Sequence, residues 1–179
     1  MNKQEIRYKL KIKRRYFQGV RRDYCDEVIA ENFVAAYGQF DSFLLYSAIG
    51  DEARTSIIEE KLLKLGKSVF FPRVEGINIV PVPCGQMKKG AFGISEPIGQ
   101  AYAGKIDVTV VPLLAVNERG FRAGYGKGFY DRYLKTAQTK PVGLGYSFQL
   151  DEFEEDEWDE PLDEFICEKG VLKFGREER

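Results

Sequence analysis

The stretch DVTVVPLLAVNERGFRAGYGKGFYDRYL, residues 107–134, sets the architecture that we expect for the whole chain. It begins with four β-branched residues at 108–111, which favour a strand buried on both faces of a sheet. Gly124, Gly126 and Gly128 then surround a lysine, and residues 129–134 have the apolar spacing of a helix start. A strand, a glycine loop and a helix N-terminus in this order can bind phosphate, because the loop and the helix start both present free backbone N–H groups.

The charged side chains of this stretch agree with a phosphate site. Arg122 and Lys127 are cationic donors, and Asp131 is a hard carboxylate ligand suited to Mg²⁺. The glycine spacing matches neither the P-loop nor the dinucleotide-binding fingerprint, and a flexible hairpin would contain similar glycines. From the residues alone, three functions stay open: a nucleotide-dependent enzyme, an α/β enzyme that holds a sugar phosphate, and a nucleic-acid-binding module that uses the basic N-terminus.

The composition limits these choices. The chain has 179 residues, of which 44% are hydrophobic and 31% charged, as expected for a single globular domain spanning residues 1–179. It has no histidine, which excludes histidine triads and histidine metal ligands, so a metal would need oxygen ligands of the kind Mg²⁺ prefers. Cys25, Cys84 and Cys167 are widely spaced, which favours reduced thiols in a cytoplasmic protein. No apolar run approaches the ~20 residues of a membrane span. The pI near 5.8 and the lack of a recognised nucleic-acid-binding motif argue against a nucleic-acid partner.

Charge is distributed unevenly along the chain. Residues 1–22 carry nine lysines and arginines against one acid, Glu5, whereas eight of the ten residues in 151–160 are acidic. The basic arm either binds phosphate or faces water. We expect the acidic run to be a solvated surface loop, because like charges repel.

Apolar periodicity and turn residues predict the remaining elements. Helices are expected at 4–17, 23–37 and 56–65, strands at 42–48, 68–71, 77–82 and 142–146, a loop at 90–104 and a hairpin at 165–174. This alternation predicts a three-layer α/β/α fold around a mixed, largely parallel sheet. Ligands of such sheets bind beyond the carboxyl ends of the strands, so the polar turn at 50–55 is a second candidate site. Phe92, in the 90–104 loop, is interpreted as a packing aromatic.

The central motif as a whole is far more specific than its glycines. Residues 122–134 follow the pattern R-x-G-x-G-K-G-[FY]-Y-D-x-x-L, which resembles the signature of the 5-formyltetrahydrofolate cyclo-ligase (methenyltetrahydrofolate synthetase) family. Weaker blocks extend the resemblance over nearly the whole chain: Lys3, Arg7 and Arg14 in a basic helix, Glu52 and Thr55 in a turn, a Gly-Ile-x-Glu-Pro segment at 93–97 and an acidic tail at 157–163. Arg54 and Cys167 depart from the family pattern, which usually has aspartate and threonine there.

The resemblance implies a fold similar to the sugar-isomerase and CoA-transferase-like architecture, and a ligase that depends on ATP and Mg²⁺. Members of this family use ATP to phosphorylate the formyl oxygen of 5-formyltetrahydrofolate. Ring closure then yields 5,10-methenyltetrahydrofolate, ADP and phosphate. The implied protein is a cytoplasmic monomer that acts on a small-molecule substrate, with no nucleic-acid or membrane partner.

The same resemblance assigns site residues. Arg122 and Lys127 would act on the transferred phosphate, Ser47 and Glu52 would contact the folate, and Asp131 and Asp163 would hold Mg²⁺. ATP would be held by two segments, which are Lys3, Gln4, Glu5, Ile6 and Arg7 in the N-terminal helix and Arg122, Ala123, Gly124, Tyr125, Gly126, Lys127, Gly128, Phe129 and Tyr130 in the central motif.

Overall fold

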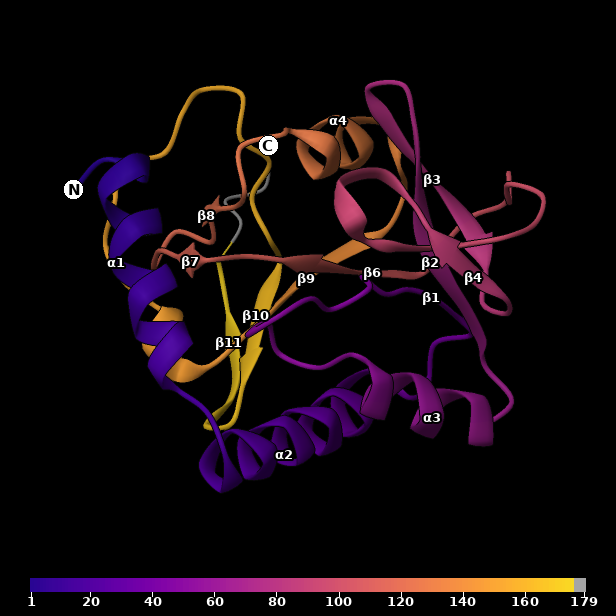
Figure 1. Cartoon of the computed structure of the whole chain (residues 1–179), viewed down its shortest axis with the longest axis horizontal. Coiled ribbons are helices and arrows are strands. Elements are labelled where there is room, and N and C mark those ends of the chain that lie inside the picture. Colours follow the sequence, from indigo (N-terminus) through magenta and orange to yellow (C-terminus); the bar gives the residue numbers. More distant parts are fainter. Residues whose placement is uncertain (176–179) are drawn as a thin grey trace.

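A mixed seven-stranded sheet forms the centre of the computed structural model, which describes residues 1–175. Its strands are β1 (Ser42–Leu44), β2 (Ser68–Glu75), β3 (Asn78–Pro83), β6 (Val108–Pro112), β9 (Lys140–Leu144), β10 (Glu164–Cys167) and β11 (Gly170–Lys173). They lie in the order β11-β10-β9-β6-β1-β2-β3 (Figure 1). The inner strands pair in parallel, and the edge strands β3 and β11 are antiparallel to their neighbours. The predicted mixed, largely parallel sheet is therefore confirmed.

The β-branched run of the central stretch forms β6, between β1 and β9. Val108 and Val110 face one hydrophobic cluster and Val111 faces another, because successive side chains of a strand point to opposite faces of the sheet. Asp107 anchors the start of this strand, since its Oδ2 accepts hydrogen bonds from the backbone N–H groups of Asp41 and Ser42, at 3.1 and 3.0 Å. The strand is buried on both faces, as its composition predicts.

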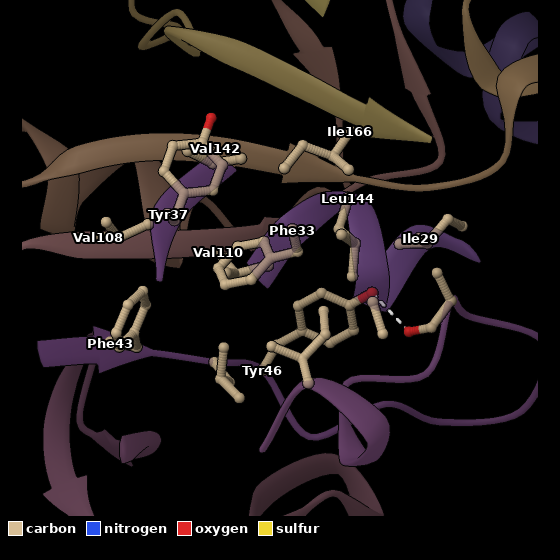
Figure 2. Packing of buried hydrophobic residues seen from close by; sticks show 14 of the residues in the cluster. Ile29, Phe33, Tyr37, Phe43, Tyr46, Val108, Val110, Val142, Leu144 and Ile166 are labelled. Atoms are coloured by element: carbon tan, nitrogen blue, oxygen red, sulfur yellow. Dashed lines mark hydrogen bonds between the residues drawn. The ribbon is translucent and has the colours of Figure 1, made fainter. Parts of the chain in front are cut away.

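Helices cover both faces of the sheet. Figure 1 shows α2 (Val20–Tyr37) and α3 (Ser56–Lys64) on one face and α4 (Phe129–Thr136) on the other. Ile29, Phe33 and Tyr37 of α2 pack against the sheet through residues such as Phe43 and Val110, as Figure 2 shows. On the opposite face, Tyr130 and Leu134 of α4 pack against the cluster that contains Val111 and Phe165. This arrangement confirms the three-layer α/β/α prediction.

The N-terminal helix α1 (Lys3–Tyr16) lies at the end of the molecule beside β7 (Ala115–Val116) and β8 (Arg122–Ala123), a short antiparallel pair (Figure 1). Asn2 and Glu5 form a reciprocal capping box at its first turn. Ile6 and Leu10 are fully buried and pack against Ala115 and Ala123. The basic arm of the sequence is therefore a docked helix.

Three predicted elements differ from the structure by more than three residues. The strand expected to end at Phe71 continues through Pro72 to Glu75 as β2. The strand expected at 42–48 is regular only over β1, because Tyr46 turns toward the next loop: its hydroxyl donates to the Ala53 carbonyl at 2.7 Å, and its own carbonyl accepts from Thr55 Oγ1 at 2.6 Å. The segment expected to be a loop at 90–104 contains β5 (Ser95–Pro97), which pairs with β4 (Met87–Lys89). The predicted C-terminal hairpin is confirmed as the β10–β11 pair.

The acidic run at 151–160 is a surface loop with several exposed side chains, as expected, but it is docked on the protein and not freely solvated. Phe153 is buried against Ile6 and Leu10 of α1, and the backbone N–H of Glu154 donates to the Met1 carbonyl at 3.0 Å. Ion pairs join this segment to the rest of the protein: Lys3 to Asp156 and Asp159, Lys9 to Asp151, and Arg119 to Glu152 and Glu155. The cations of α1 and the turn after β7 offset the repulsion between like charges, so that the segment lies against the protein.

The cysteines Cys25, Cys84 and Cys167 are free thiols, in agreement with the expected reduced state. Within residues 1–175, the helices are all too short or too polar to cross a lipid bilayer.

Candidate functional site

A cavity of about 290 Å³ opens beyond the carboxyl ends of β1 and β6, where the sheet topology predicts a ligand site. Lys3 and Arg7 of α1 and residues 124–131 of the central stretch form one side of it. The turn that follows β1 forms another. The remaining wall comes from β2, β3 and the β4–β5 region. The lining residues outside 124–131 are Lys3, Arg7, Tyr46, Ser47, Ile49, Glu52, Pro72, Val74, Ile79, Phe92, Ile94, Glu96, Pro112, Arg122 and Asp159.

The glycine loop has the backbone conformation that its sequence requires. Gly126 and Gly128 have φ angles of 85° and 70°, in the left-handed region that residues with a Cβ rarely adopt. Gly128 is also the N-cap of α4, so the loop leads directly into free N–H groups at the helix start. These groups and the positive end of the helix dipole favour an anion at this end of the cavity.

Four cationic side chains line the same end of the cavity. Arg7 donates from Nε to the Gly124 carbonyl at 2.7 Å and so joins α1 to the glycine loop. Arg122, only 6% exposed, forms an ion pair with Asp131 at 3.0 Å. The ammonium group of Lys127 lies 4.8 Å from the centre of the Phe92 ring. With Lys3, these residues provide the positive charge that a polyphosphate requires.

The other residues expected to hold ATP are placed differently. Gln4 and Glu5 are exposed on the first turn of α1, and Glu5 caps the helix through the backbone N–H of Asn2. The side chains of Ile6 and Ala123 are buried together in the hydrophobic cluster beneath α1. None of these four residues lines the cavity, whereas Tyr125, Phe129 and Tyr130 do.

The two residues expected to contact the folate line the cavity from the segment after β1. Ser47 donates from Oγ to the Ser95 carbonyl at 2.8 Å, which joins this segment to β5. Glu52 is 5% exposed, and its Oε2 accepts from the backbone N–H of Ile49 at 2.9 Å. Burial raises the pKa of Glu52, while the Tyr125 hydroxyl, the Ile49 N–H and the Arg14 guanidinium act in the opposite direction.

The carboxylates expected to hold Mg²⁺ are separated. Asp131 lines the cavity, but Asp163 does not: its backbone N–H donates to the Pro141 carbonyl at 2.9 Å, and its carbonyl accepts from Phe174 at 3.0 Å. The second lining carboxylate near the cationic end is Asp159, which is paired with Lys3. Residues 1–175 contain no group of three or more acidic, cysteine or histidine side chains that could enclose a metal by themselves. One or two carboxylates with phosphate and water suit Mg²⁺, so Asp131 and Asp159 fit its donor chemistry.

The interpretation of Phe92 as a packing aromatic is wrong. Its side chain is 62% exposed and lines the cavity beside Lys127 and Phe129, with 6.0 Å between the two ring centres. Its φ angle of 59° is the only positive value among the non-glycine residues described, which marks a locally strained backbone.

Sequence reasoning missed Ile79 and Tyr46 in the apolar part of the cavity lining, whereas Ile94 and Glu96 belong to the 93–97 segment that carries part of the family resemblance. Ile79 of β3, Ile94 and the ring of Tyr46 line this part. Glu96, which is 6% exposed, adds a carboxylate that accepts from the backbone N–H of Val74 at 3.0 Å. No local pattern identifies Ile79 and Tyr46 as lining residues, because they come from β3 and from the segment after β1, which meet only in the folded protein. The lining therefore combines cationic side chains that suit an anion with apolar and aromatic side chains that suit a flat ring.

Comparisons with known proteins agree with this geometry. The model of the 5-formyltetrahydrofolate cyclo-ligase family matches residues 1–168. The chain is 29% identical over 172 residues to the 5-formyltetrahydrofolate cyclo-ligase of Mycoplasma pneumoniae, which covers 93% of the chain and 98% of that protein. A 64-residue segment is 48% identical to the cyclo-ligase of Mycoplasma genitalium, covering 35% of the chain and 39% of that relative. The structure of 5,10-methenyltetrahydrofolate synthetase from Aquifex aeolicus is similar with a TM-score of 0.86 and 32% identity, over 100% of this chain and 97% of that chain.

Proposed function

The chain belongs to the 5-formyltetrahydrofolate cyclo-ligase family and is an enzyme that converts 5-formyltetrahydrofolate to 5,10-methenyltetrahydrofolate, and we propose that it does so with ATP and Mg²⁺ in the cavity described above. The observation that supports this proposal most directly is that a glycine loop, four cationic side chains and an apolar wall line one cavity. This arrangement suits a polyphosphate placed against a flat heterocycle.

In the first step, the γ-phosphoryl group moves from ATP to the formyl oxygen. The bond from phosphorus to the bridging oxygen of ADP breaks, and a new bond to the formyl oxygen forms. Lys127 and Arg122 offset the charge on the phosphoryl oxygens during this transfer, together with N–H groups of the glycine loop. Lys3 and Arg7, which project from α1, hold the other two phosphate groups of ATP.

In the second step, the neighbouring ring amine of the folate attacks the formyl carbon. The carbon–oxygen bond to phosphate breaks, phosphate leaves, and the amine loses its proton to give the 5,10-methenyl product. No protein nucleophile is required, which is consistent with a chain that has no histidine. The contribution of the protein is to orient the two substrates and to exclude water.

Mg²⁺, when bound, would neutralise negative charge on the phosphate oxygens. We assign its protein ligands to Asp131 and Asp159, because both line the cavity beside the cationic side chains. The resemblance had suggested Asp163 in place of Asp159.

The folate would occupy the apolar part of the cavity. Glu52 is a buried carboxylate with lone pairs available to ring N–H donors, and Ser47 lies five residues before it in the same wall. The flat ring system would contact Ile79, Ile94 and the ring of Phe92.

The direct test is a turnover assay with purified protein, 5-formyltetrahydrofolate, ATP and MgCl₂, in which formation of the methenyl product and of ADP is measured. We expect one ADP for each methenyl product, and no product when ATP or the metal is omitted. Product formation without ATP would contradict the proposed coupling. Binding of a sugar phosphate or an oligonucleotide with no turnover of folate would favour the alternative functions.

A further inference from the structure

A chain of hydrogen bonds crosses the cavity wall between the glycine loop and the turn after β1. The Tyr125 hydroxyl contacts Glu52 Oε1 at 2.5 Å, and Arg14 Nη2 contacts the same hydroxyl at 3.0 Å. Arg14 is only 4% exposed, and its Nε also donates to Asp51 at 2.8 Å. Three segments that are far apart in the sequence therefore meet at one hydroxyl group.

The direction of these hydrogen bonds follows from the chemistry of the groups. A guanidinium group has donors and no acceptor, so the Tyr125 oxygen must accept from Arg14. The proton of the hydroxyl is then directed to the carboxylate of Glu52. A hydroxyl that donates to a carboxylate in this way helps to fix the orientation of the carboxylate.

The backbone of the Glu52 turn is held separately, by a residue of α2. Nη2 of Arg22, on α2, donates to the carbonyls of Gly50 and Glu52 at 3.0 and 2.8 Å. Loss of the Tyr125 hydroxyl would therefore leave the turn in place and free only the carboxylate that faces the cavity.

We propose that Tyr125 is a positioning residue, whose hydroxyl, oriented by Arg14, directs Glu52 toward the folate and joins the phosphate-binding loop to the folate end of the cavity. This inference rests on the proposed function, and it adds a role for Tyr125 that is distinct from contact with ATP. Tyr125 is suited to this role because its ring lines the cavity while its hydroxyl lies between two charged groups.

The test is the Tyr125→Phe variant, which retains the ring and removes the hydroxyl. We expect the KM for 5-formyltetrahydrofolate to rise about tenfold, the usual effect of losing a hydrogen bond to a charged group. The kcat and the KM for ATP should change by about twofold or less, because the backbone of the loop and its cations are intact.

The pH dependence of kcat/KM for folate provides a readout that a purely structural role would not change. The groups that face Glu52 are Arg14, Asp51, Tyr46, Tyr125 and Tyr130, together with the Ile49 N–H. The Tyr125 hydrogen bond lowers the pKa of Glu52, so its removal should raise that pKa and move the acid limb of the profile to higher pH.

Two further variants complete the experiment. Tyr133→Phe is the matched control, because it removes a hydroxyl from α4 at a residue that does not line the cavity, and its kinetics should equal wild type. In Glu52→Gln, the added Tyr125→Phe change should have little further effect on folate KM, since the two groups act as a pair.

The outcomes separate the inference from the proposed function. If wild type converts 5-formyltetrahydrofolate and Tyr125→Phe has the same folate KM and pH profile, the positioning role is wrong and the proposed function stands. Equal effects of Tyr125→Phe in the wild-type and Glu52→Gln backgrounds would also overturn it. If wild type neither binds nor converts 5-formyltetrahydrofolate with ATP, both proposals fail together.

Discussion

At the scale of single residues, Lys127 is the side chain whose loss we expect to reduce turnover most. Its ammonium group lines the cavity at the glycine loop, where the transferred phosphoryl group would pass. Lys127→Ala should lower kcat by about a hundredfold, the typical cost of removing one preorganised donor at a developing charge. The dissociation constant for 5-formyltetrahydrofolate should change little.

Steady-state kinetics and folate titration measure both effects. Lys135→Ala is the control, since Lys135 is an exposed lysine in the last turn of α4 and does not line the cavity. Turnover of Lys127→Ala at the wild-type rate would remove this lysine from the mechanism.

The choice between Asp159 and Asp163 is also a question about single residues. Asp131→Asn and Asp159→Asn should each raise the Mg²⁺ concentration needed for half-maximal activity by about tenfold or more. Mg²⁺ is bound by only one or two protein carboxylates, so the loss of either one removes a large part of its protein ligands. Asp163→Asn should leave that concentration unchanged, since Asp163 does not line the cavity.

The measurement is a Mg²⁺ titration of initial rates at saturating ATP for the three variants, with melting temperatures to confirm folding. A raised Mg²⁺ requirement in Asp163→Asn with none in Asp159→Asn would reverse our assignment. An unchanged titration in Asp131→Asn would instead identify Asp131 as an acid that only stabilises the start of α4.

At the scale of elements, α1 combines a buried face with a phosphate-facing one. Ile6 and Leu10 fix the helix to the protein, so the cations of its other face can be changed without removing the helix. Lys3→Gln with Arg7→Gln should raise the KM for ATP about a hundredfold, because each charge-assisted contact to phosphate contributes roughly 1.5–3 kcal/mol. The KM for folate should change by far less.

The control for this prediction is Lys11→Gln, an exposed lysine of the same helix that is not part of the cavity. Both KM values are measured for each single variant and for the pair, since Lys3 also pairs with Asp156 and Asp159 and its loss could weaken folding. An ATP KM within about twofold of wild type in a folded double variant would mean that α1 has only a structural role.

At the scale of the whole molecule, the acidic segment links the C-terminal part of the chain to α1 and to the turn after β7. Its contact with Arg119 lowers the pKa of Glu155. A carboxylate whose pKa is lowered on folding stabilises the protein above its ordinary value of 4.5, and this stabilisation is lost as the pH falls through the lowered value. We therefore expect the segment to detach below that pH before the sheet unfolds.

Trp158 is the single tryptophan of the chain and lies in this segment, 58% exposed, so its fluorescence reports on the segment alone. Its emission should change at a higher pH than the far-ultraviolet circular dichroism of the sheet and helices. Arg119→Gln should move the fluorescence transition to higher pH and leave the circular dichroism transition where it is in the wild type. Coincident transitions in both proteins would show that the segment and the core unfold as one unit.

The local sequence determined the helices and strands, and it also determined the conformation of the glycine loop at the candidate site. The β-branched run formed a central buried strand, and the glycines at 126 and 128 adopt the positive φ angles that their lack of a Cβ permits. Apolar spacing located α1, α2 and α3 to within about three residues, the usual boundary error. Backbone preference and amphipathic period act over a few neighbouring residues, so they can be recognised along the chain.

Only the tertiary structure determined which side chains meet. Tyr125 and Glu52 are 73 positions apart, and Lys3 lies 156 positions from Asp159, so no local pattern contains either pair. The acidic run shows the same limit: its repulsion predicts a solvated loop, and the cations that offset it come from α1 and the turn after β7. Such contacts depend on how the helices and loops pack against the sheet. The fold brings together side chains that are far apart along the chain, and a local sequence pattern covers only neighbouring residues.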